Sequence, residues 1–379
     1  MDNNCIKKIM TFKSGNFTFS AKYNVSELNN LLFKAQVLYS ALSGVPRLPE
    51  WSTYLEEELI RRSIFSTAAI EGNPLKEEDV GKIIKQTDLG TNNNEATQAI
   101  INLKDVYNYI KTIKPTKDAT ILSDDFIREA HRIITTGLNN TDNLPGKYRN
   151  HLVKVGNNKH GGIYIPPKCL PDIENLMKEF VEWMNCKEVI ELDVFIRAAL
   201  AHYHLGLIHP FGNGNGRTIR IVEAMLLRTS GIKYVPTMLS NYYYRNIDDY
   251  YFTFSNTLKN PDHDVTPFIK FMLDGVIESL NEIKDNIYFR IRLLLLRDYC
   301  AFLKDKGSIT QRQQDLLSML LEIPKSITLK DLLNTSPYNS LYRDVSERTA
   351  RRDISNLLNM DILLQKENGE YDLNTHVVD

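Results

Sequence analysis

A short stretch from His209 to Arg220 concentrates more chemically reactive groups than any other part of the sequence. It contains one imidazole, three glycines and two guanidinium groups: His209, Gly212, Gly214, Gly216, Arg217 and Arg220. Glycines allow successive backbone N–H groups to surround an anion, and a helix that follows them adds its positive N-terminal end. Guanidinium groups bind phosphate oxygens in a bidentate manner, and an imidazole with a pKa of about 6.5 can accept a proton at neutral pH. The stretch therefore predicts a phosphate-binding loop beside a general base.

Helical patterns flank this stretch on both sides. Apolar residues recur near a 3.6-residue period between Asp193 and Leu207, and the period resumes from Ile221 to Leu226. We therefore expect helix, loop and helix, with both arginines in the first turns of the second helix. A P-loop is excluded because no Gly-Lys-Ser/Thr ends the loop, and a helix before the glycines disfavours a dinucleotide-binding fingerprint. The alternative is a glycine-rich surface turn with two solvated arginines, but the close grouping of base, glycines and arginines favours a site.

The stretch closely resembles the signature of Fic-domain proteins, His-x-Phe-x-Asp/Glu-Gly-Asn-Gly-Arg-x-x-Arg. Every fixed position matches except Asn213, where the family usually has an acidic residue. The resemblance implies a mainly α fold, with a Fic helical core and a small β-hairpin flap. It also implies a nucleotidyltransferase that moves AMP from ATP, with Mg²⁺, onto a Ser, Thr or Tyr hydroxyl of a protein.

The resemblance assigns roles to the residues of the stretch. His209 would be the catalytic base, and Phe211 would anchor the loop in the core. The expected ATP-binding residues here are Gly212, Gly214, Asn215, Gly216, Arg217 and Arg220, with Arg217 at the β-phosphate and Arg220 at the γ-phosphate. Asn213 is a weak metal candidate, because a neutral amide oxygen lacks the charge of the family's carboxylate. We therefore expect weaker Mg²⁺ binding and slower transfer, or preference for another divalent ion or nucleotide.

Glu71 stands at the end of a helix predicted from about Trp51 to Ile70, just before a Gly-Asn-Pro stop. The helix macrodipole disfavours an acid there by a few tenths to about 1 kcal/mol, so the residue is a place to expect function. The alternative is that Glu71 is solvated or pairs with nearby Arg61 or Arg62.

The segment from Thr67 to Gly72 resembles the inhibitory motif of the Fic family, Ser/Thr-x-x-x-Glu-Gly/Asn. In relatives with this motif before the Fic core, the glutamate pairs with the second arginine of the signature and blocks productive placement of the ATP γ-phosphate. The resemblance implies Thr67, Glu71 and Gly72 as inhibitory residues, and it predicts an ion pair between Glu71 and Arg220. In some relatives the same glutamate also positions water for the removal of AMP.

Residues 146–167 read as a β-hairpin, with apolar residues on both sides of a glycine-rich turn at 156–162. By itself this pattern is typical of a surface hairpin. In the Fic resemblance it is the flap, whose backbone holds a segment of the target protein by strand addition. Val153, Ile163 and Tyr164 are the expected target-binding residues.

Tyrosines gather after the signature, at residues 242–244 and at 250–251. Their helical spacing favours core packing for most of them. Fic relatives place a Tyr-Tyr pair in a corresponding helix, so Tyr250 and Tyr251 are the candidates for stacking on adenine and for ATP binding.

The C-terminal segment has a different pattern, in which two short helices precede a hairpin with Asn368-Gly369 at its tip. It resembles the winged helix–turn–helix of DeoR-type regulators. Its arginines Arg348, Arg351 and Arg352 can meet DNA phosphates or bases, or can be the solvated face of a dimerisation or target-docking module. The alternative function is therefore a DNA-binding transcriptional regulator whose Fic core senses nucleotide with little turnover.

Composition places the chain among ordinary globular proteins, with 379 residues, 42% hydrophobic, 25% charged and a net charge of −1. Its scattered cysteines, Cys5, Cys169, Cys186 and Cys300, argue against a disulfide framework or a zinc site. With no long apolar run and no signal-like N-terminus, we expect a cytoplasmic protein without membrane contact. The expected regions are an N-terminal helical region with the inhibitory helix (1–115), the Fic catalytic core (116–280), a linker helix (281–304) and the winged module (305–379). The sequence leaves open whether two copies form a homodimer.

Overall fold

A computed structural model describes residues 5–46, 49–86, 94–115, 121–139 and 142–379. The chain divides into two compact units, Met1–Asn281 and Glu282–Asp379. The first unit holds helices α1 (Val25–Ser43), α2 (Pro49–Ile70), α3 (Glu77–Lys85), α4 (Glu95–Thr112), α5 (Asp124–Thr135), α6 (Leu170–Met184), α7 (Lys187–Ile190), α8 (Val194–Ile208), α9 (Asn215–Thr229), α10 (Val235–Arg245) and α11 (Ile247–Leu258). Helix α12 (Thr266–Asp305) begins in the first unit and ends in the second. The mainly helical fold predicted from the sequence is confirmed.

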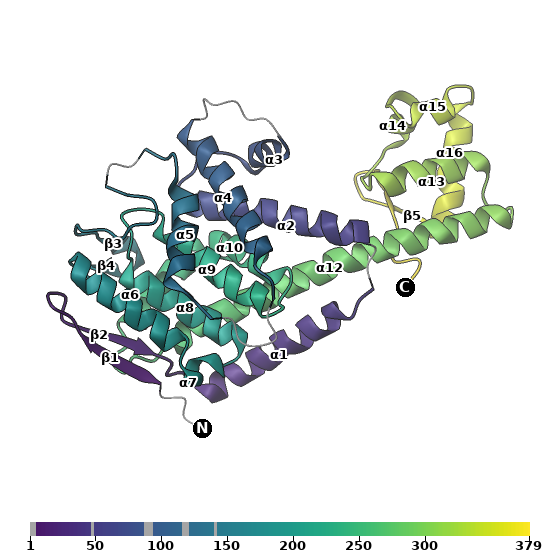
Figure 1. Cartoon of the computed structure of the whole chain (residues 1–379). Coiled ribbons are helices and arrows are strands. Elements are labelled where there is room, and N and C mark those ends of the chain that lie inside the picture. The colour runs from purple at the N-terminus through teal and green to yellow at the C-terminus, as the bar shows by residue number, and fades with distance from the viewer. Residues whose placement is uncertain (1–4, 47–48, 87–93, 116–120, 140–141) are drawn as a thin grey trace. The chain divides into compact units, whose positions relative to one another are not determined.

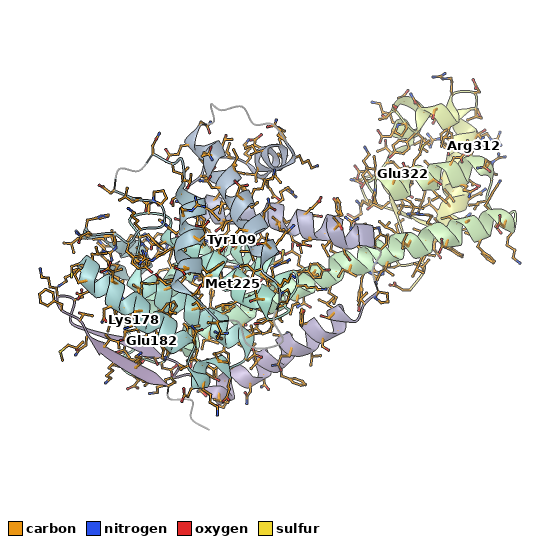
Figure 2. The ribbon with its side chains drawn as sticks, in the orientation of Figure 1. Tyr109, Lys178, Glu182, Met225, Arg312 and Glu322 are labelled. Atoms are coloured by element: carbon orange, nitrogen blue, oxygen red, sulfur yellow. The ribbon has the colours of Figure 1, made fainter. Side chains whose placement is uncertain are left out.

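Helices α8 and α9 form the centre of the first unit, with α5, α6 and α10 around them (Figure 1). Every residue of α8 from Phe195 to Ile208 is buried, so this helix is covered on all sides and not along one stripe. Among the side chains labelled in Figure 2, Met225 of α9 is buried, whereas Lys178 and Glu182 of α6 are exposed. The loop between α8 and α9 is therefore joined at each end to a buried helix.

Two antiparallel hairpins accompany these helices in the first unit (Figure 1). Strands β1 (Ile6–Met10) and β2 (Asn16–Ser20) pair around the predicted turn, with Ile6 opposite Ser20. Strands β3 (Val155–Asn157) and β4 (Gly162–Tyr164) form the second hairpin, with a 3₁₀ turn η1 (Asn158–His160) between them. The strands are shorter than expected, and Val153 precedes β3 without being part of it.

Most predicted helix boundaries agree with the structure. Helix α2 ends at Ile70, and α5 begins after Ser123, whose hydroxyl accepts the Phe126 N–H. The linker helix expected at 281–304 is part of a longer continuous helix, α12. The run Thr91-Asn92-Asn93-Asn94 predicts a polar turn, and all of it except Asn94 lies outside the described residues.

The second unit contains α13 (Gln311–Glu322), α14 (Leu329–Asn334), α15 (Asn339–Tyr342) and α16 (Glu347–Asn359), followed by the hairpin of β5 (Leu363–Gln365) and β6 (Tyr371–Leu373). Leucines from α13 and α16 fill its core together with Ile362. The arginines at 348, 351 and 352 are exposed on α16, where Arg351 also pairs with Glu347. The winged-helix assignment and the four regions proposed from sequence stay predictions. Among the described helices, none is long and apolar enough to cross a membrane.

The separate core of the second unit leads to a stability prediction. Leu316 is fully buried there, and its replacement by alanine should cost about 2–5 kcal/mol through lost burial and a residual cavity. Hydrogen exchange of Leu316→Ala should accelerate in α13 and α16 more than in α8. Leu364→Ala is the matched control, because Leu364 is 48% exposed in the same unit. Equal exchange in the two variants would contradict this account of the core.

Candidate functional site

A cavity of about 460 Å³ lies between the α8–α9 loop, the β3–β4 hairpin and helix α11. Most of the site residues predicted from the sequence line it: Glu71, Ile163, Tyr164, His209, Gly212, Asn213, Gly214, Asn215, Gly216, Arg220, Tyr250 and Tyr251. Arg217, Thr67, Gly72 and Val153 do not line it. Residues far apart in the sequence thus meet around one space of a size that suits a small ligand.

The loop between the two central helices has a defined conformation. His209 caps α8 in the left-handed region, with φ 48° and ψ 59°, and its N–H donates to Leu205 O at 3.0 Å. Gly214, with φ 78°, turns the chain into α9, a conformation that favours glycine. The Asn215 amide bonds both backbone groups of Phe211, at 3.0 and 2.8 Å. The Asn215 side chain therefore holds the loop in shape.

Two buried residues that the sequence reasoning missed also fix this loop. His131 of α5 stacks on Phe211 with ring centroids 3.6 Å apart, donates to Asn213 O at 2.9 Å and accepts the Gly146 N–H at 2.9 Å. Arg149 donates to the carbonyls of His209 and Pro167, both at 2.8 Å. Phe211 is 1% exposed, which confirms it as a core anchor. A single histidine in an amphipathic helix carries no sequence signal for this role.

The environment of His209 keeps its imidazole neutral. The pKa of His209 is lowered to about 4, mainly by burial and also by the nearby charge of Arg149, while the charge of Glu71 acts in the opposite direction. At neutral pH the side chain is therefore unprotonated. An imidazole in this form can accept a proton from a hydroxyl group placed in the cavity.

Glu71 and Arg220 form the ion pair predicted from the sequence, with 2.8 Å between Glu71 Oε1 and Arg220 Nη2. Arg220 also donates to the hydroxyl of Thr67 and, at 3.1 Å, to its carbonyl. The alternative partners of Glu71 are occupied elsewhere, since Arg61 pairs with Glu77 and Arg62 with Glu58. A Cβ at Gly216 would lie 2.3 Å from Glu71 Oε1, so the glycine leaves room for the carboxylate at the start of α9.

The electrostatics of Glu71 favour its ionised form. Burial alone would raise its pKa, but the charges of Arg220 and Arg217 and the hydrogen bond from Arg220 outweigh burial, and the pKa lies below the ordinary 4.5. Glu71 is thus a carboxylate at neutral pH. It neutralises a guanidinium that is only 2% exposed.

The residues of the loop do not assemble a metal site by themselves. Asn213 Oδ1 accepts the Gly214 N–H at 2.6 Å and Arg217 Nη2 at 3.2 Å. Glu71 is the only carboxylate among the described residues that line the cavity, and it is paired with Arg220. A divalent cation prefers several hard oxygen ligands, so most of its shell would have to come from a bound phosphate.

The two tyrosine groups behave differently. Tyr242 and Tyr243 are buried, which confirms core packing for them. Tyr250 lines the cavity, and its hydroxyl donates to His202 Nε2 at 2.8 Å. Tyr251 also lines the cavity, with its ring 5.2 Å from that of His160.

Of the three residues predicted to bind a target, only Ile163 has a largely exposed side chain. The Ile163 side chain is 54% exposed, whereas the Tyr164 hydroxyl donates to Leu207 O at 3.1 Å and its pKa is raised by burial. Val153 is partly buried outside the strand. The hairpin tip is held to α11 by Asp248, which pairs with His160 at 2.6 Å.

Part of the chain matches a known protein family. Residues 121–227 match the Fic/DOC family, a segment that includes the hairpin, His209 and both signature arginines. The chain also has the fold of a Fic family protein from Desulfovibrio desulfuricans G20 (TM-score 0.55, 19% identity, 92% of this chain and 95% of that one) and of Fic-1 from Caenorhabditis elegans (TM-score 0.55, 21% identity, 69% and 74%). These likenesses confirm the predicted Fic fold.

Among curated proteins, the relatives are protein adenylyltransferases. The chain is 29% identical over 244 residues to the protein adenylyltransferase Fic of Culex quinquefasciatus, which covers 64% of this chain and 45% of that protein. It is 30% identical over 171 residues to the protein adenylyltransferase fic-1 of Caenorhabditis elegans, covering 44% and 32%. The matched segments thus span less than half the length of these relatives.

The Glu71–Arg220 contact leads to a pH-dependent stability prediction. Glu71→Gln leaves Arg220 without its charged partner and should cost about 1.5–3 kcal/mol of unfolding free energy at pH 7. Because the folded-state pKa of Glu71 lies below 4.5, its contribution is present above that pH and is lost as the pH falls through the folded-state value. Urea unfolding of the wild type and the variant should therefore converge at acidic pH. A constant difference down to pH 3 would contradict the ion pair.

The neutral state of His209 can be measured directly. In a ¹³C NMR titration of the full chain labelled at histidine, the His209 signal, assigned with His209→Asn, should titrate with a midpoint near 4. Glu71→Gln should move the midpoint lower still, since the carboxylate favours the protonated imidazole. A midpoint near 6.5 in either protein would show a solvated imidazole and contradict the site geometry.

Proposed function

We propose that this protein is an auto-inhibited protein adenylyltransferase, which transfers AMP from ATP to a Ser, Thr or Tyr hydroxyl of a protein target. The observation that carries the proposal is the arrangement in one cavity of a neutral imidazole, a glycine-rich loop at a helix N-terminus, and an arginine blocked by a carboxylate. The Fic domain and the adenylyltransferase relatives support it.

In the proposed reaction the target oxygen attacks the α-phosphorus of ATP in line with the departing pyrophosphate. A P–O bond forms to the target as the P–O bond to pyrophosphate breaks. His209 accepts the hydroxyl proton, a step that typically contributes about 10²–10⁴-fold in rate. The N–H groups of Gly212 and Gly216 are proposed to bind the α- and β-phosphates, and the Gly214 N–H would join them after leaving Asn213 Oδ1. Asn215 acts by holding the loop in shape. Arg217, behind the cavity wall, contributes charge at the β-phosphate.

Arg220 is the proposed receptor of the γ-phosphate, and Glu71 is its competitor. An ionised carboxylate and a γ-phosphate both carry negative charge, so they cannot share the guanidinium without strong repulsion. ATP therefore binds productively only when Glu71 has left. Thr67 and Gly72 belong to the same proposed inhibitory segment. A variant of the proposed function is the removal of AMP from the target, with Glu71 positioning the water.

Mg²⁺ is proposed to arrive with ATP. When bound, the ion would neutralise phosphate charge, and Asn213 Oδ1 is the amide oxygen that could reach it after leaving Arg217. Tyr250 and Tyr251 are the proposed adenine-binding residues. Val153, Ile163 and Tyr164 stay the proposed flap contacts for the target, with the exposed Ile163 as the outward contact.

Further expectations from the sequence stay predictions. A cytoplasmic location stays a prediction from the sequence, and whether two copies form a homodimer stays open. DNA binding by the C-terminal module also stays a prediction, and with it the alternative of a transcriptional regulator. The exposed arginines of α16 permit it, but no cavity or contact of the described residues favours it over the transferase.

The proposal is tested with labelled ATP and Mg²⁺ in cell lysate. Glu71→Gly should transfer AMP to itself or to lysate proteins at least tenfold faster than the wild type, because it frees Arg220. Glu71→Gly with His209→Ala should transfer none. Glu191→Gly is the matched control, since Glu191 also follows a helix end but is exposed and lies outside the cavity. Mass spectrometry would identify the modified hydroxyls, and the absence of label in Glu71→Gly would refute the transferase.

A further inference from the structure

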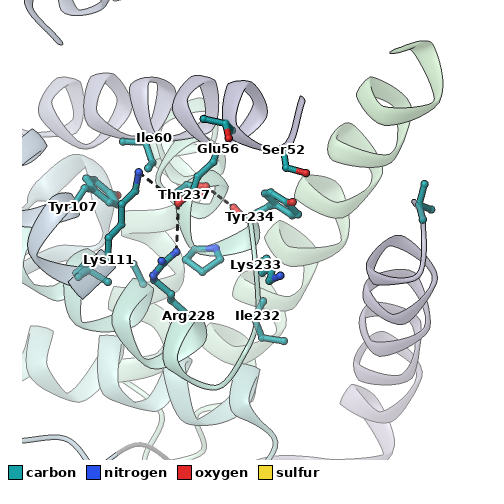
Figure 3. A pocket seen from close by; sticks show the side chains of 15 residues that line it. Ser52, Glu56, Ile60, Tyr107, Lys111, Arg228, Ile232, Lys233, Tyr234 and Thr237 are labelled. Carbon is teal, nitrogen blue, oxygen red and sulfur yellow. Dashed lines mark hydrogen bonds and ion pairs between the residues drawn. The ribbon is translucent and has the colours of Figure 1, made fainter. Parts of the chain in front are cut away.

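A second cavity, of about 450 Å³, lies in the first unit among helices α2, α4, α9 and α10 (Figure 3). None of the residues that line it lines the first cavity. Its volume falls in the range of small-molecule sites. The signature and inhibitory motifs contribute no residue to its walls, so the proposed reaction leaves this cavity unexplained.

The charges in this cavity are unbalanced. Lys111 of α4 and Arg228 of α9 converge on Glu56 of α2, and both lie 3.5 Å from the same oxygen, Oε1 (Figure 3). A charge-assisted hydrogen bond is normally about 2.7–2.9 Å long, so neither cation has a close partner in Glu56. Arg228 Nε is buried without a hydrogen-bond partner among the described residues, and Lys233 adds a third positive charge to the lining.

Apolar groups complete the walls of the cavity. Ile60, Ile110 and Pro236 line it together with the side chains of Tyr107 and Tyr234. Small-molecule sites typically combine such apolar walls with a few convergent polar groups. The lining therefore suits a ligand with a compact apolar or aromatic body and an anionic group.

The backbone at the cavity rim is strained. Tyr234 has φ 69° and ψ −49°, which is unfavourable for a bulky residue. Its carbonyl accepts the backbone N–H of Thr237 at 3.0 Å and its hydroxyl at 2.6 Å, and Tyr39 holds the preceding turn through Gly231 O at 2.6 Å. Such conformations persist where surrounding contacts fix them, and they cluster at ligand sites.

From these observations we propose that the cavity binds a small organic ligand with a compact aromatic body and an anionic group. Lys111 and Arg228 hold the anionic group in place of Glu56. The anionic group of the ligand accepts the short hydrogen bonds from Lys111 and Arg228 that Glu56 does not accept. Glu56 belongs to α2 and Glu71 directly follows this helix, whereas Arg228 and Arg220 both belong to α9. Displacing Glu56 therefore removes one contact between the helices that the Glu71–Arg220 pair also joins.

Calorimetric titration of the full-length chain tests the proposal with phenyl phosphate and benzoate, which distinguish a phosphate from a carboxylate group, and with neutral phenol. One of the two anions should bind, and phenol should not. Arg228→Gln and Lys111→Gln should each weaken binding about tenfold, as expected for the loss of one charge-assisted contact. Glu56→Gln should tighten it several-fold, because the competing carboxylate is gone.

Two controls separate this site from the first cavity and from general charge effects. Glu57→Gln makes the same change at the exposed neighbouring residue and should leave binding unchanged. Arg217→Gln, beside the first cavity, should also leave it unchanged. The proposal is overturned if neither anion binds even to Glu56→Gln, or if Arg217→Gln weakens binding while Arg228→Gln does not. Because the readout is binding alone, the result is independent of whether the protein transfers AMP.

Discussion

The contact between Glu71 and Arg220 is the constraint around which the first cavity is built. Arg220 is 2% exposed, and a guanidinium so deeply buried requires an anionic partner, since leaving it unpaired costs several kcal/mol. The carboxylate that fills this need lies at the N-terminal end of α9, within 2.3 Å of where a Gly216 Cβ would be. A helix N-terminus beside an arginine is a site for any anion. Glu71 therefore occupies the place that a phosphate group would take.

The shape of the loop beside this ion pair depends on residues that take no direct part in the proposed reaction. His131 stacks under Phe211 and bonds Asn213 O, and Arg149 bonds the carbonyl of His209. Asn215 closes the loop through both backbone groups of Phe211. These contacts hold the backbone N–H groups and the imidazole in position before a ligand arrives. Such preorganisation spares the cost of ordering the loop at the moment of binding.

Local patterns predicted the helices and turns well, because the physics that forms them is local. The Gly-Asn-Pro stop after Ile70 marked the end of α2, and the glycine spacing marked the turn into α9. The Glu71–Arg220 pair was predicted only through resemblance, since no local rule joins residues 149 positions apart. His131 and Arg149 were missed for the same reason. Their roles arise from packing between α5, the loop and the hairpin, which periodicity cannot show. The second cavity depends likewise on side chains from four separate helices.

The two side chains proposed to be inhibitory make different contacts with Arg220. Thr67 and Glu71 stand four positions apart, so they lie on the same face at the end of α2. Thr67 binds Arg220 through its hydroxyl and its carbonyl, neither of which carries a net charge. These contacts can persist when a phosphate replaces the carboxylate, so the guanidinium stays aimed at the cavity. Glu71 alone contributes the competing charge, and the α2 macrodipole slightly disfavours it there. In the proposed function, one residue of α2 orients Arg220 and the residue that follows the helix blocks it, so the block could be released while Arg220 stays oriented.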